Sequence, residues 1–395
     1  MGSKPCGALP CIDRITGIVP RNTNRRKAAT MAFTHPHVHS EMRSLDGLRR
    51  DEAGPKRATA LGQEAMAITD HADLTGAYAF RKASLHEGIR PIIGVEFYLA
   101  IGSRSEKNSE TVANDDDNAT DADDGKEKSK KYMHLTVVAR NETGWKNLLA
   151  LHNKAEDYFR YKPRIDFDLI KKHREGLTIL TGCLGGPVAG PLSRAGATEK
   201  RGDAQTAELF RTEARKNLDI LIDAVGREHV FLEVMYHGIG AEVHAFREIR
   251  ALSEETGIPL VATNDCHYEH QEDAHAYDAF LAVVKKTLDD PERFSSNGTP
   301  DYYIKSEDEM LAVLGNPKMK PQLPHGERHV PTPSWSLIRL LIGPFLTTGS
   351  ASPISRSRRV KALRKNSCIS WLKMEQKTAV TGASLKRSEI VCASG

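Results

Sequence analysis

Short apolar runs alternate with longer segments in which apolar residues recur every three or four positions, beginning near residue 33. The runs have the length and the turn-residue borders of buried β-strands, and they cover residues 65–69, 91–98, 134–139, 177–181, 230–235 and 259–262. The longer segments have the spacing of amphipathic helices and cover residues 145–155, 204–225 and 242–256. Repeated strand-then-helix order predicts an α/β fold built on a parallel barrel or sheet.

Two segments, one ahead of this pattern and one inside it, show neither period. Residues 1–30 are polar and basic, which predicts a disordered extension before a domain that covers residues 31–285. Residues 103–131 contain two aspartate-rich runs followed by lysines, with almost no apolar residue. Because such a segment cannot bury enough apolar surface to fold, we expect a flexible acidic loop within that domain.

The C-terminal segment of residues 315–395 differs from the rest in both pattern and charge. It is rich in Pro, Ser, Lys and Arg, and it contains 14 Lys or Arg and 3 Asp or Glu, whereas the whole chain contains 56 and 52. No amphipathic period emerges, which predicts a basic tail of low order. Contact with nucleic acid through its arginine and lysine clusters is the alternative.

Composition narrows the cellular setting. The six cysteines have no regular spacing, which favours a reducing, cytoplasmic compartment over a disulfide-bonded secreted protein. No apolar stretch approaches the roughly 18 residues that span a bilayer, and the start lacks the apolar core of a secretory signal. We therefore expect no membrane partner.

Two pairs of metal-ligand residues lie at the ends of predicted strands. In His37-Val38-His39 the imidazoles are two positions apart, and alternate side chains of a strand point to the same face, so both could bind one metal ion. Asp265-Cys266-His267 repeats this spacing after the apolar run that ends at residue 262. One such pair is as often structural as functional, but two at strand ends favour a metal site.

Further candidate ligands lie beside other predicted strands. Glu96, His71 and Cys183 each follow an apolar run, and His134 begins one. Active sites of parallel barrels gather at the C-terminal ends of their strands, where most of these residues lie. With Asp46, the candidate metal ligands are His37, His39, Asp46, His71, Glu96, His134, Cys183, Asp265 and His267.

This mixture of imidazole, carboxylate and thiolate groups favours a cluster of two or three divalent metal ions. Zinc suits the set best, and manganese or iron would accept much of it. A carboxylate such as Glu96 can bridge two ions, which a neutral imidazole cannot. Because divalent ions lower the pKa of water and neutralise charge on a phosphoryl group, phosphoester hydrolysis is the expected reaction.

Longer strings around the candidate ligands resemble the polymerase and histidinol phosphatase (PHP) domain, in the form found in the alpha subunit of bacterial DNA polymerase III. Runs at residues 132–148 and 161–168 indicate this polymerase form. The resemblance extends from about residue 32 to residue 314. The strings that carry it are Phe33-Thr-His-Pro-His-Val-His-Ser40, Ala67-Ile-Thr-Asp-His71, Gly88-Ile-Arg-Pro-Ile-Ile-Gly-Val-Glu96, Thr181-Gly-Cys-Leu-Gly-Gly186 and Ala262-Thr-Asn-Asp-Cys-His-Tyr268.

The resemblance implies a distorted (β/α)7 barrel, similar to a TIM barrel, in which all nine candidates bind metal. Family members with the full set remove 3′ nucleotides from DNA and can proofread, whereas members that have lost ligands retain the barrel as a support for the polymerase. The first ion's ligands are also the expected catalytic residues. The ligands implied for three ions are, in turn, His37, His39, Glu96 and Asp265; Glu96, His134 and Cys183; and Asp46, His71 and His267.

The same resemblance implies partners. DNA 3′ ends are the expected substrate, and in the full-length family other replisome subunits bind the chain, including the sliding clamp, whose binding region has no counterpart here. Residues 286–314 are expected to begin the link to a polymerase palm, and the family pattern stops near residue 314. We therefore expect no polymerase active site in this chain, and a shifted reading frame is one hypothesis for the tail.

Two departures from the family pattern and two alternative functions stay open. Met42-Arg43 and Ala72-Asp73 replace the residues usual beside the ligands, which predicts weaker metal affinity or a poorer substrate fit. One alternative is a non-catalytic, truncated fragment whose barrel is only structural. The other is a free-standing PHP phosphatase for a small phosphomonoester, which the polymerase-like run at residues 132–148 disfavours.

Three other features have simpler interpretations. Asp166 and Asp168 precede a helical segment within the barrel sequence, so a capping or surface role is expected. His270 and His275 are five positions apart, which does not place them on one helix face, so we expect them on a solvated surface. His35 is expected to point to the same side as the two ligand histidines that follow it, and to support them.

Overall fold

A computed structural model describes residues 33–42, 47–48, 52–105, 132–159, 162–284 and 299–315 of the chain. Several sequence-based expectations lie outside these residues. They are the disordered extension of residues 1–30, Arg43, the candidate ligand Asp46, nearly all of the acidic loop of residues 103–131, residues 286–298 of the expected link to a palm, and the basic tail of residues 315–395 beyond its first residue.

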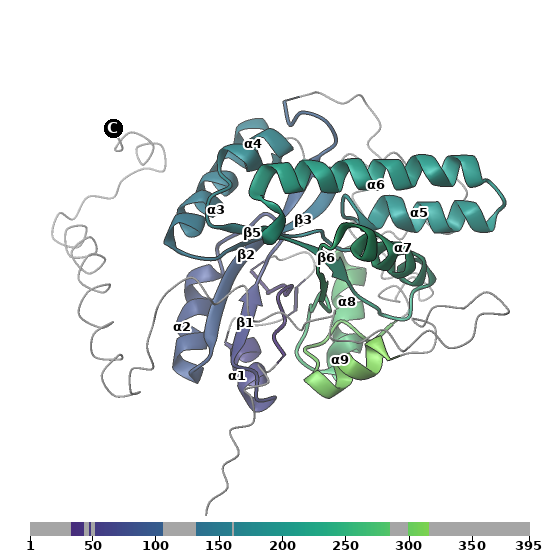
Figure 1. Ribbon diagram of the computed structural model, residues 1–395. Helices are drawn as coiled ribbons and strands as arrows, with labels where there is room; N and C mark the ends of the chain where they lie inside the picture. The colour runs from purple at the N-terminus through teal and green to yellow at the C-terminus, as the bar shows by residue number, and fades with distance from the viewer. Residues whose placement is uncertain are drawn as a thin grey trace, which may run out of the picture. The chain divides into compact units, whose positions relative to one another are not determined.

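The centre of the fold is a mixed seven-stranded sheet (Figure 1). Its strand order is β1-β2-β3-β5-β6-β7, and the short strand β4 pairs with β2 outside this path. The six predicted strand runs are all present as strands. The strands are β1 (Ala65–Ile68), β2 (Arg90–Ala100), β3 (Tyr132–Ala139), β4 (Arg164–Ile165), β5 (Leu177–Leu180), β6 (Val230–Val234) and β7 (Leu260–Ala262).

Strand β3 departs from the predicted parallel arrangement. It pairs antiparallel with both β2 and β5, whereas the β1–β2, β5–β6 and β6–β7 pairs are parallel. The expectation of a wholly parallel sheet is therefore wrong at this strand. A parallel connection needs a crossover, usually a helix, and residues 101–131 contain no helical apolar period that could supply one.

The segment of residues 33–39 joins the two ends of the sheet. On one side the His35 carbonyl accepts a hydrogen bond from Ala67 N of β1 at 3.0 Å. On the other side His39 N donates to the Cys266 carbonyl, just beyond β7, at 2.8 Å. The sheet thus curls into a distorted α/β barrel, and the predicted fold class is confirmed.

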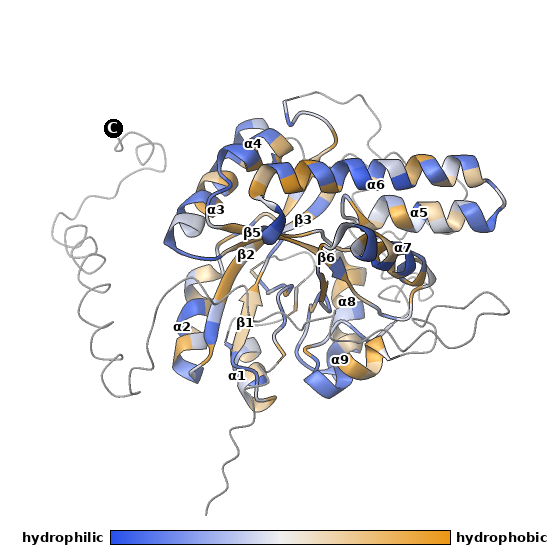
Figure 2. Cartoon of the chain, in the orientation of Figure 1, coloured by the Kyte–Doolittle hydropathy of each residue, from blue (hydrophilic) through white to orange (hydrophobic). Residues whose placement is uncertain are grey.

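Helices cover the outside of the sheet (Figure 1). Their apolar faces turn inward and their polar faces outward, while the strands are apolar (Figure 2). Fully buried leucines such as Leu148 and Leu221 pack against the sheet, each contributing about 1.5–3 kcal/mol. The helices are α1 (Ala53–Ala60), α2 (Ala77–Glu87), α3 (Glu142–Ala155), α4 (Phe167–Lys172), α5 (Ala189–Lys200), α6 (Ala204–Val225), α7 (Gly240–Thr256), α8 (Ala274–Val284) and α9 (Glu307–Leu314).

Three short 3₁₀ helices occupy Glu156–Tyr158, Arg227–His229 and Gln271–Asp273. Among the helices in the described part of the chain, none has both the length and the apolar character needed to cross a membrane.

Local expectations for Asp166, His270 and His275 are confirmed. The Asp166 carboxylate accepts a hydrogen bond from Leu169 N at 3.0 Å and caps the start of α4. Both histidines are exposed to solvent. These residues are therefore structural or surface groups and lie outside the metal-ligand cluster.

A segment after α8 supports the rim of the barrel beyond β7. Asn264 donates from Nδ2 to the carbonyls of Asp301 and Tyr303, at 2.7 and 2.8 Å. The next residue, Asp265, has a φ of 41°, which non-glycine residues adopt only with strain. The hydrogen bonds of the Asn264 side chain therefore hold a strained turn from which the Asp265 carboxylate projects.

The close contact between Gly144 and Gly176 gives a test of the packing of α3 on the sheet. A Cβ at position 144 would lie 1.9 Å from the Gly176 carbonyl oxygen, so Gly144→Ala must displace backbone. We expect it to lower the free energy of unfolding by about 1–3 kcal/mol in urea denaturation. Gly240→Ala is the control, because an added Cβ there meets no atom within 4 Å. Equal losses in the two variants would contradict this packing.

Candidate metal centre

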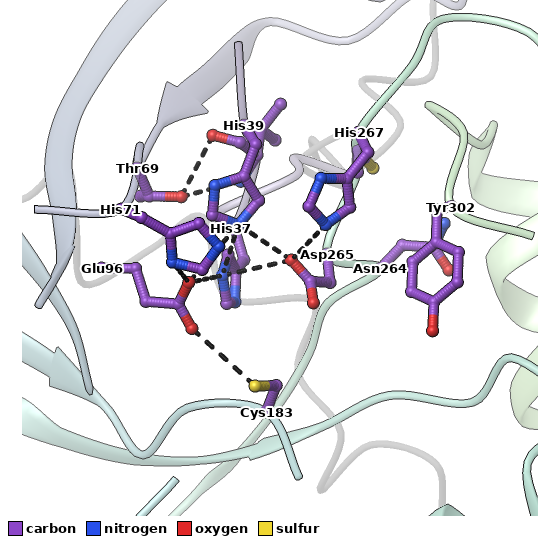
Figure 3. Close-up of polar contacts among 12 residues, drawn as sticks. His37, His39, Thr69, His71, Glu96, Cys183, Asn264, Asp265, His267 and Tyr302 are labelled. Carbon is purple, nitrogen blue, oxygen red and sulfur yellow. Dashed lines mark hydrogen bonds and ion pairs between the residues drawn. The ribbon is translucent and has the colours of Figure 1, made fainter. Parts of the chain in front are cut away.

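The candidate ligands gather at one rim of the barrel (Figure 3). His71 follows β1, Cys183 follows β5, and Asp265 and His267 follow β7, so they lie where parallel strands end. His134 lies near the start of β3 and still reaches this rim, because β3 runs antiparallel to its neighbours. The reversal of one strand therefore explains why a ligand candidate at a strand start joins the others.

Glu96 of β2 lies at the centre of the cluster. Its Oε2 atom lies 2.6 Å from His71 Nδ1, and its Oε1 atom lies 3.1 Å from His134 Nδ1. The Cys183 Sγ atom lies 3.8 Å from both Glu96 Oε1 and His134 Nδ1. The two oxygens of one buried carboxylate therefore face different nitrogen ligands, as a bridging carboxylate would.

His37 and His39 complete the cluster on its other side. Their Nε2 atoms lie 3.2 Å apart, and they lie 3.6 and 3.5 Å from Glu96 Oε2. Asp265 Oδ1 lies 2.9 Å from His39 Nε2, 3.4 Å from His37 Nε2 and 3.5 Å from His267 Nε2. Three trios have ligand atoms mutually within 4.8 Å: His37, His39 and Glu96; His39, Asp265 and His267; and His71, Glu96 and His134.

His71 and His267 both stack on His39, with ring centroids 4.3 and 4.6 Å apart. In the ligand grouping implied by the resemblance, these two residues share a third ion with Asp46. Among the described residues, His71 lies 2.6 Å from Glu96 and His267 lies 3.5 Å from Asp265. Eight of the nine sequence-predicted ligands thus lie together in the described residues, and the ninth, Asp46, lies outside them.

Glu233 of β6 is a member of this site that the sequence did not reveal. Its Oε1 atom lies 2.7 Å from His37 Nδ1 and accepts from Thr263 Oγ1 at 2.8 Å, while its Oε2 accepts from Gly182 N at 2.9 Å. Because a carboxylate accepts, His37 Nδ1 carries a proton, and in the neutral ring the Nε2 lone pair faces the cluster. The available signal was one acid inside the apolar strand Val-Phe-Leu-Glu-Val.

The charges of the cluster depend on one another. Burial raises the pKa of Glu96 and of Asp265, but neighbouring histidines outweigh it and hold both pKa values well below the ordinary range. Burial together with His71 and His267 lowers the pKa of His39 to about 3. Burial and then Glu96 raise the pKa of the Cys183 thiol. Glu96 and Asp265 therefore stay ionised because the neighbouring histidines supply positive charge.

A divalent cation fits this donor set. Among the described residues, the recorded ion pairs of Glu96, Asp265 and Glu233 come from histidine and none from Lys or Arg. Imidazole nitrogens, carboxylate oxygens and a thiol converge on one another at less than 4 Å, which is the ligand chemistry of zinc and related ions. The chain therefore presents a buried, anionic, nitrogen-rich site suited to divalent metal.

His35 does not behave as expected. Its Nε2 atom donates to the Lys305 carbonyl at 2.8 Å, and its Nδ1 lies 3.4 Å from Cys266 Sγ. The chain bends at Pro36 and His37, so the side-chain alternation of a regular strand is lost between His35 and His37. The expectation that His35 points with the ligand histidines is wrong, and its contacts anchor the segment of residues 33–39 instead.

Ala72, one of the departures from the family pattern, lies directly beside the cluster. Its φ is 49°, in the left-handed region that glycine adopts without strain. Its N–H donates to the Glu96 carbonyl at 2.8 Å, which holds the turn after His71 against β2. The departure therefore introduces local backbone strain but leaves the turn in place.

The contacts of Glu233 generate a test that does not depend on activity. In Glu233→Gln an amide nitrogen replaces one carboxylate oxygen and cannot accept a hydrogen bond, so either Gly182 N–H or both His37 Nδ1–H and Thr263 Oγ1–H lose their acceptor. We expect the affinity for zinc, measured by chelator competition, to fall about ten- to a hundredfold. Glu213→Gln, at a half-exposed acid of α6, is the control. An unchanged affinity in Glu233→Gln would show that this carboxylate does not orient the site.

His35 generates a test of stability against pH. Burial is the main cause that lowers its pKa to about 4, against an ordinary value of 6.5. Between these values the unfolded chain takes up a proton that the folded chain does not, so stability falls as the pH falls. In urea unfolding with chelator, we expect His35→Gln to reduce this slope by up to about 1.4 kcal/mol per pH unit. His86→Gln, at an exposed position, is the control. The parental slope in His35→Gln would refute the assignment.

Comparison with known proteins relates this geometry to a family. The family model described as the PHP domain matches residues 35–237. DNA polymerase III subunit alpha of Treponema pallidum is 37% identical over 288 residues, covering 72% of this chain and 22% of that protein. The subunit of the same name from Mycobacterium tuberculosis is 35% identical over 289 residues, with 72% and 23% covered. The chain thus spans less than a quarter of the length of these relatives.

Among solved structures, a protein described as a metal-dependent phosphoesterase from Bifidobacterium adolescentis matches 71% of this chain and 95% of its own, at 13% identity and a TM-score of 0.34. That likeness is too distant to inform the site. The family assignment stands on the sequence matches: the PHP model covers residues 35–237, which include β1 to β6 and the ligand candidates up to Cys183. The chain belongs to the PHP domain family.

Proposed function

We propose that this chain is a metal-dependent phosphodiesterase of the 3′–5′ exonuclease type, acting on DNA 3′ ends in a proofreading role beside a replicative polymerase. Its relatives named DNA polymerase III subunit alpha support the link to replication. The observation that carries the proposal is Glu96, whose two buried oxygens face separate histidine groups. This arrangement suits two adjacent ions, which is the form of site that clamps a phosphodiester.

The proposed ligands are the residues expected from the sequence. His37, His39, Glu96 and Asp265 would hold one ion and act as the catalytic set. His134 and Cys183 would hold a second with Glu96, and Asp46, His71 and His267 a third. Zinc suits this donor set best, with manganese or iron as alternatives.

Bound ions would act as Lewis acids on a phosphoester and lower the pKa of water near them. The chain's own residues prepare the site for this. Glu233 keeps the proton of His37 on Nδ1, so that the lone pair of Nε2 is available to coordinate a metal ion. The low pKa values of Glu96 and Asp265 keep both carboxylates ionised at neutral pH, ready to accept cations without first losing protons.

Asp265→Asn tests the proposal, since it removes a charge without changing the size of the side chain. We expect hydrolysis of single-stranded and mismatched 3′ ends to fall by at least about a hundredfold. The barrel should remain folded by circular dichroism. Asp219→Asn, at an exposed position of α6, should retain parental activity.

Further measurements separate this proposal from its alternatives. Faster hydrolysis of a small phosphomonoester than of DNA ends would favour the phosphatase alternative. Absence of bound metal by emission spectroscopy would favour a purely structural barrel. Parental activity in Asp265→Asn would show that the proposed catalytic set is wrong.

A further inference from the structure

Lys162 lies beside the metal-ligand cluster, one aromatic ring away. Its Nζ lies 3.3 Å from Tyr98 Oη and 5.0 Å from the centre of the Tyr98 ring. Tyr98 stacks on His71, with ring centroids 5.9 Å apart, and meets His134 edge-on at 5.4 Å. Lys162 and Tyr98 are both buried, and Tyr98 contacts the proposed ligands His71 and His134.

A few residues before Lys162 in the chain, two consecutive aromatic side chains are exposed, and a basic group contacts one of them. Tyr158 is 47% exposed and Phe159 58% exposed, although aromatic rings of this size are usually buried. The Arg104 guanidinium lies 5.0 Å from the centre of the Tyr158 ring and donates to the Lys154 carbonyl. Lys162 follows Phe159 by three residues, so their Cα atoms are within about 11 Å.

Three cations lie close enough to His173 to lower its pKa. The pKa of His173, at the end of α4, is lowered first by burial and then by Lys172, Lys154 and Arg104. Lys154 also pairs with Asp157 at 3.1 Å, and Arg104 approaches Asp166 at 3.9 Å. Arg104, Lys154 and Lys172 therefore lie near His173, with Asp157 and Asp166 among them. We name Arg104, Lys154, Tyr158, Phe159 and Lys172 the basic-aromatic shelf.

This combination fits one kind of nucleic acid. Exposed rings bind unpaired bases by stacking, and cations between them neutralise the phosphates, whereas a duplex hides its base faces. The chain runs from the shelf residues Tyr158 and Phe159 into β4, and β4 lies beside the cluster because its Arg164 pairs with Tyr98 of β2. We propose that the basic-aromatic shelf binds the unpaired 3′-terminal nucleotides of single-stranded DNA and leads the strand past Lys162 to the metal-ligand cluster. The inference rests on the proposed function, since it takes the cluster to be the end of the strand's path.

Binding of 5′-fluorescein-labelled oligothymidylate, followed by fluorescence anisotropy, tests the shelf. The full chain carries Asp265→Asn, so that the strand is not consumed. We expect the double variant Tyr158→Ala/Phe159→Ala to raise the Kd roughly tenfold, through lost stacking. Lys154→Ala/Lys172→Ala should reduce the slope of log K against log salt concentration by about 1.4, through two lost phosphate contacts.

The matched control is Lys82→Ala/Leu85→Ala, which removes an exposed lysine and a half-exposed apolar side chain from α2. It should change neither the Kd nor the salt slope. An equal effect in control and shelf variants, or no binding by the parent, would overturn the proposal.

Hydrolysis of thymidine 5′-p-nitrophenyl phosphate separates this inference from the proposed function. Shelf variants with native Asp265 should cleave this mononucleotide within about twofold of the parental rate, because it is too short to reach the shelf. If the parent does not cleave it or DNA, the proposed hydrolytic function fails, and the anisotropy result still decides whether the shelf binds single strands. A large loss of mononucleotide cleavage in the shelf variants would show that they disturb the cluster, and would count against a separate shelf.

Discussion

The mutual neutralisation of buried carboxylates and imidazoles at one rim of the barrel is the interaction on which the site depends. Glu96 and Glu233 are almost wholly buried, and an unpaired carboxylate so placed would be strongly destabilising. Each instead meets histidine nitrogens, at 2.6 Å for Glu96 and 2.7 Å for Glu233. Buried charged groups of this kind would destabilise an ordinary core, but they suit a cation site, because a divalent ion replaces the protons that otherwise balance the acids.

Barrel closure places these groups within reach of one another. The segment of residues 33–39 hydrogen-bonds both to β1 and to the chain beyond β7, and it carries His37 and His39 into the middle of the rim. His35 anchors the same segment from the opposite direction through Lys305. The two ligand histidines are therefore fixed by the same contacts that close the sheet, so metal binding and barrel integrity should be coupled.

The rim also contains backbone strain and a surface beyond the cluster. Ala72 and Asp265 both adopt positive φ, and each directly follows or forms part of the ligand set. Strain at such positions persists only where surrounding contacts hold it. Here the Glu96 carbonyl accepts a hydrogen bond from Ala72 N, and the Asn264 side chain hydrogen-bonds the chain beside Asp265. On the β4 side, Tyr98 lies between Lys162 and the ligand candidate His134.

The sequence by itself determined the α/β class, six of the strands and the set of ligand candidates, because apolar period and ligand chemistry are local properties of the chain. It did not determine the direction of β3, the side on which His35 lies or the part played by Glu233. Those depend on which strands become neighbours, because a strand's direction is set by its pairing. Glu233 orients His37 only because β6 brings its carboxylate to His37 Nδ1, 196 positions earlier in the chain. Convergence of distant residues on one rim is a property of the closed sheet, and only the tertiary structure decided it.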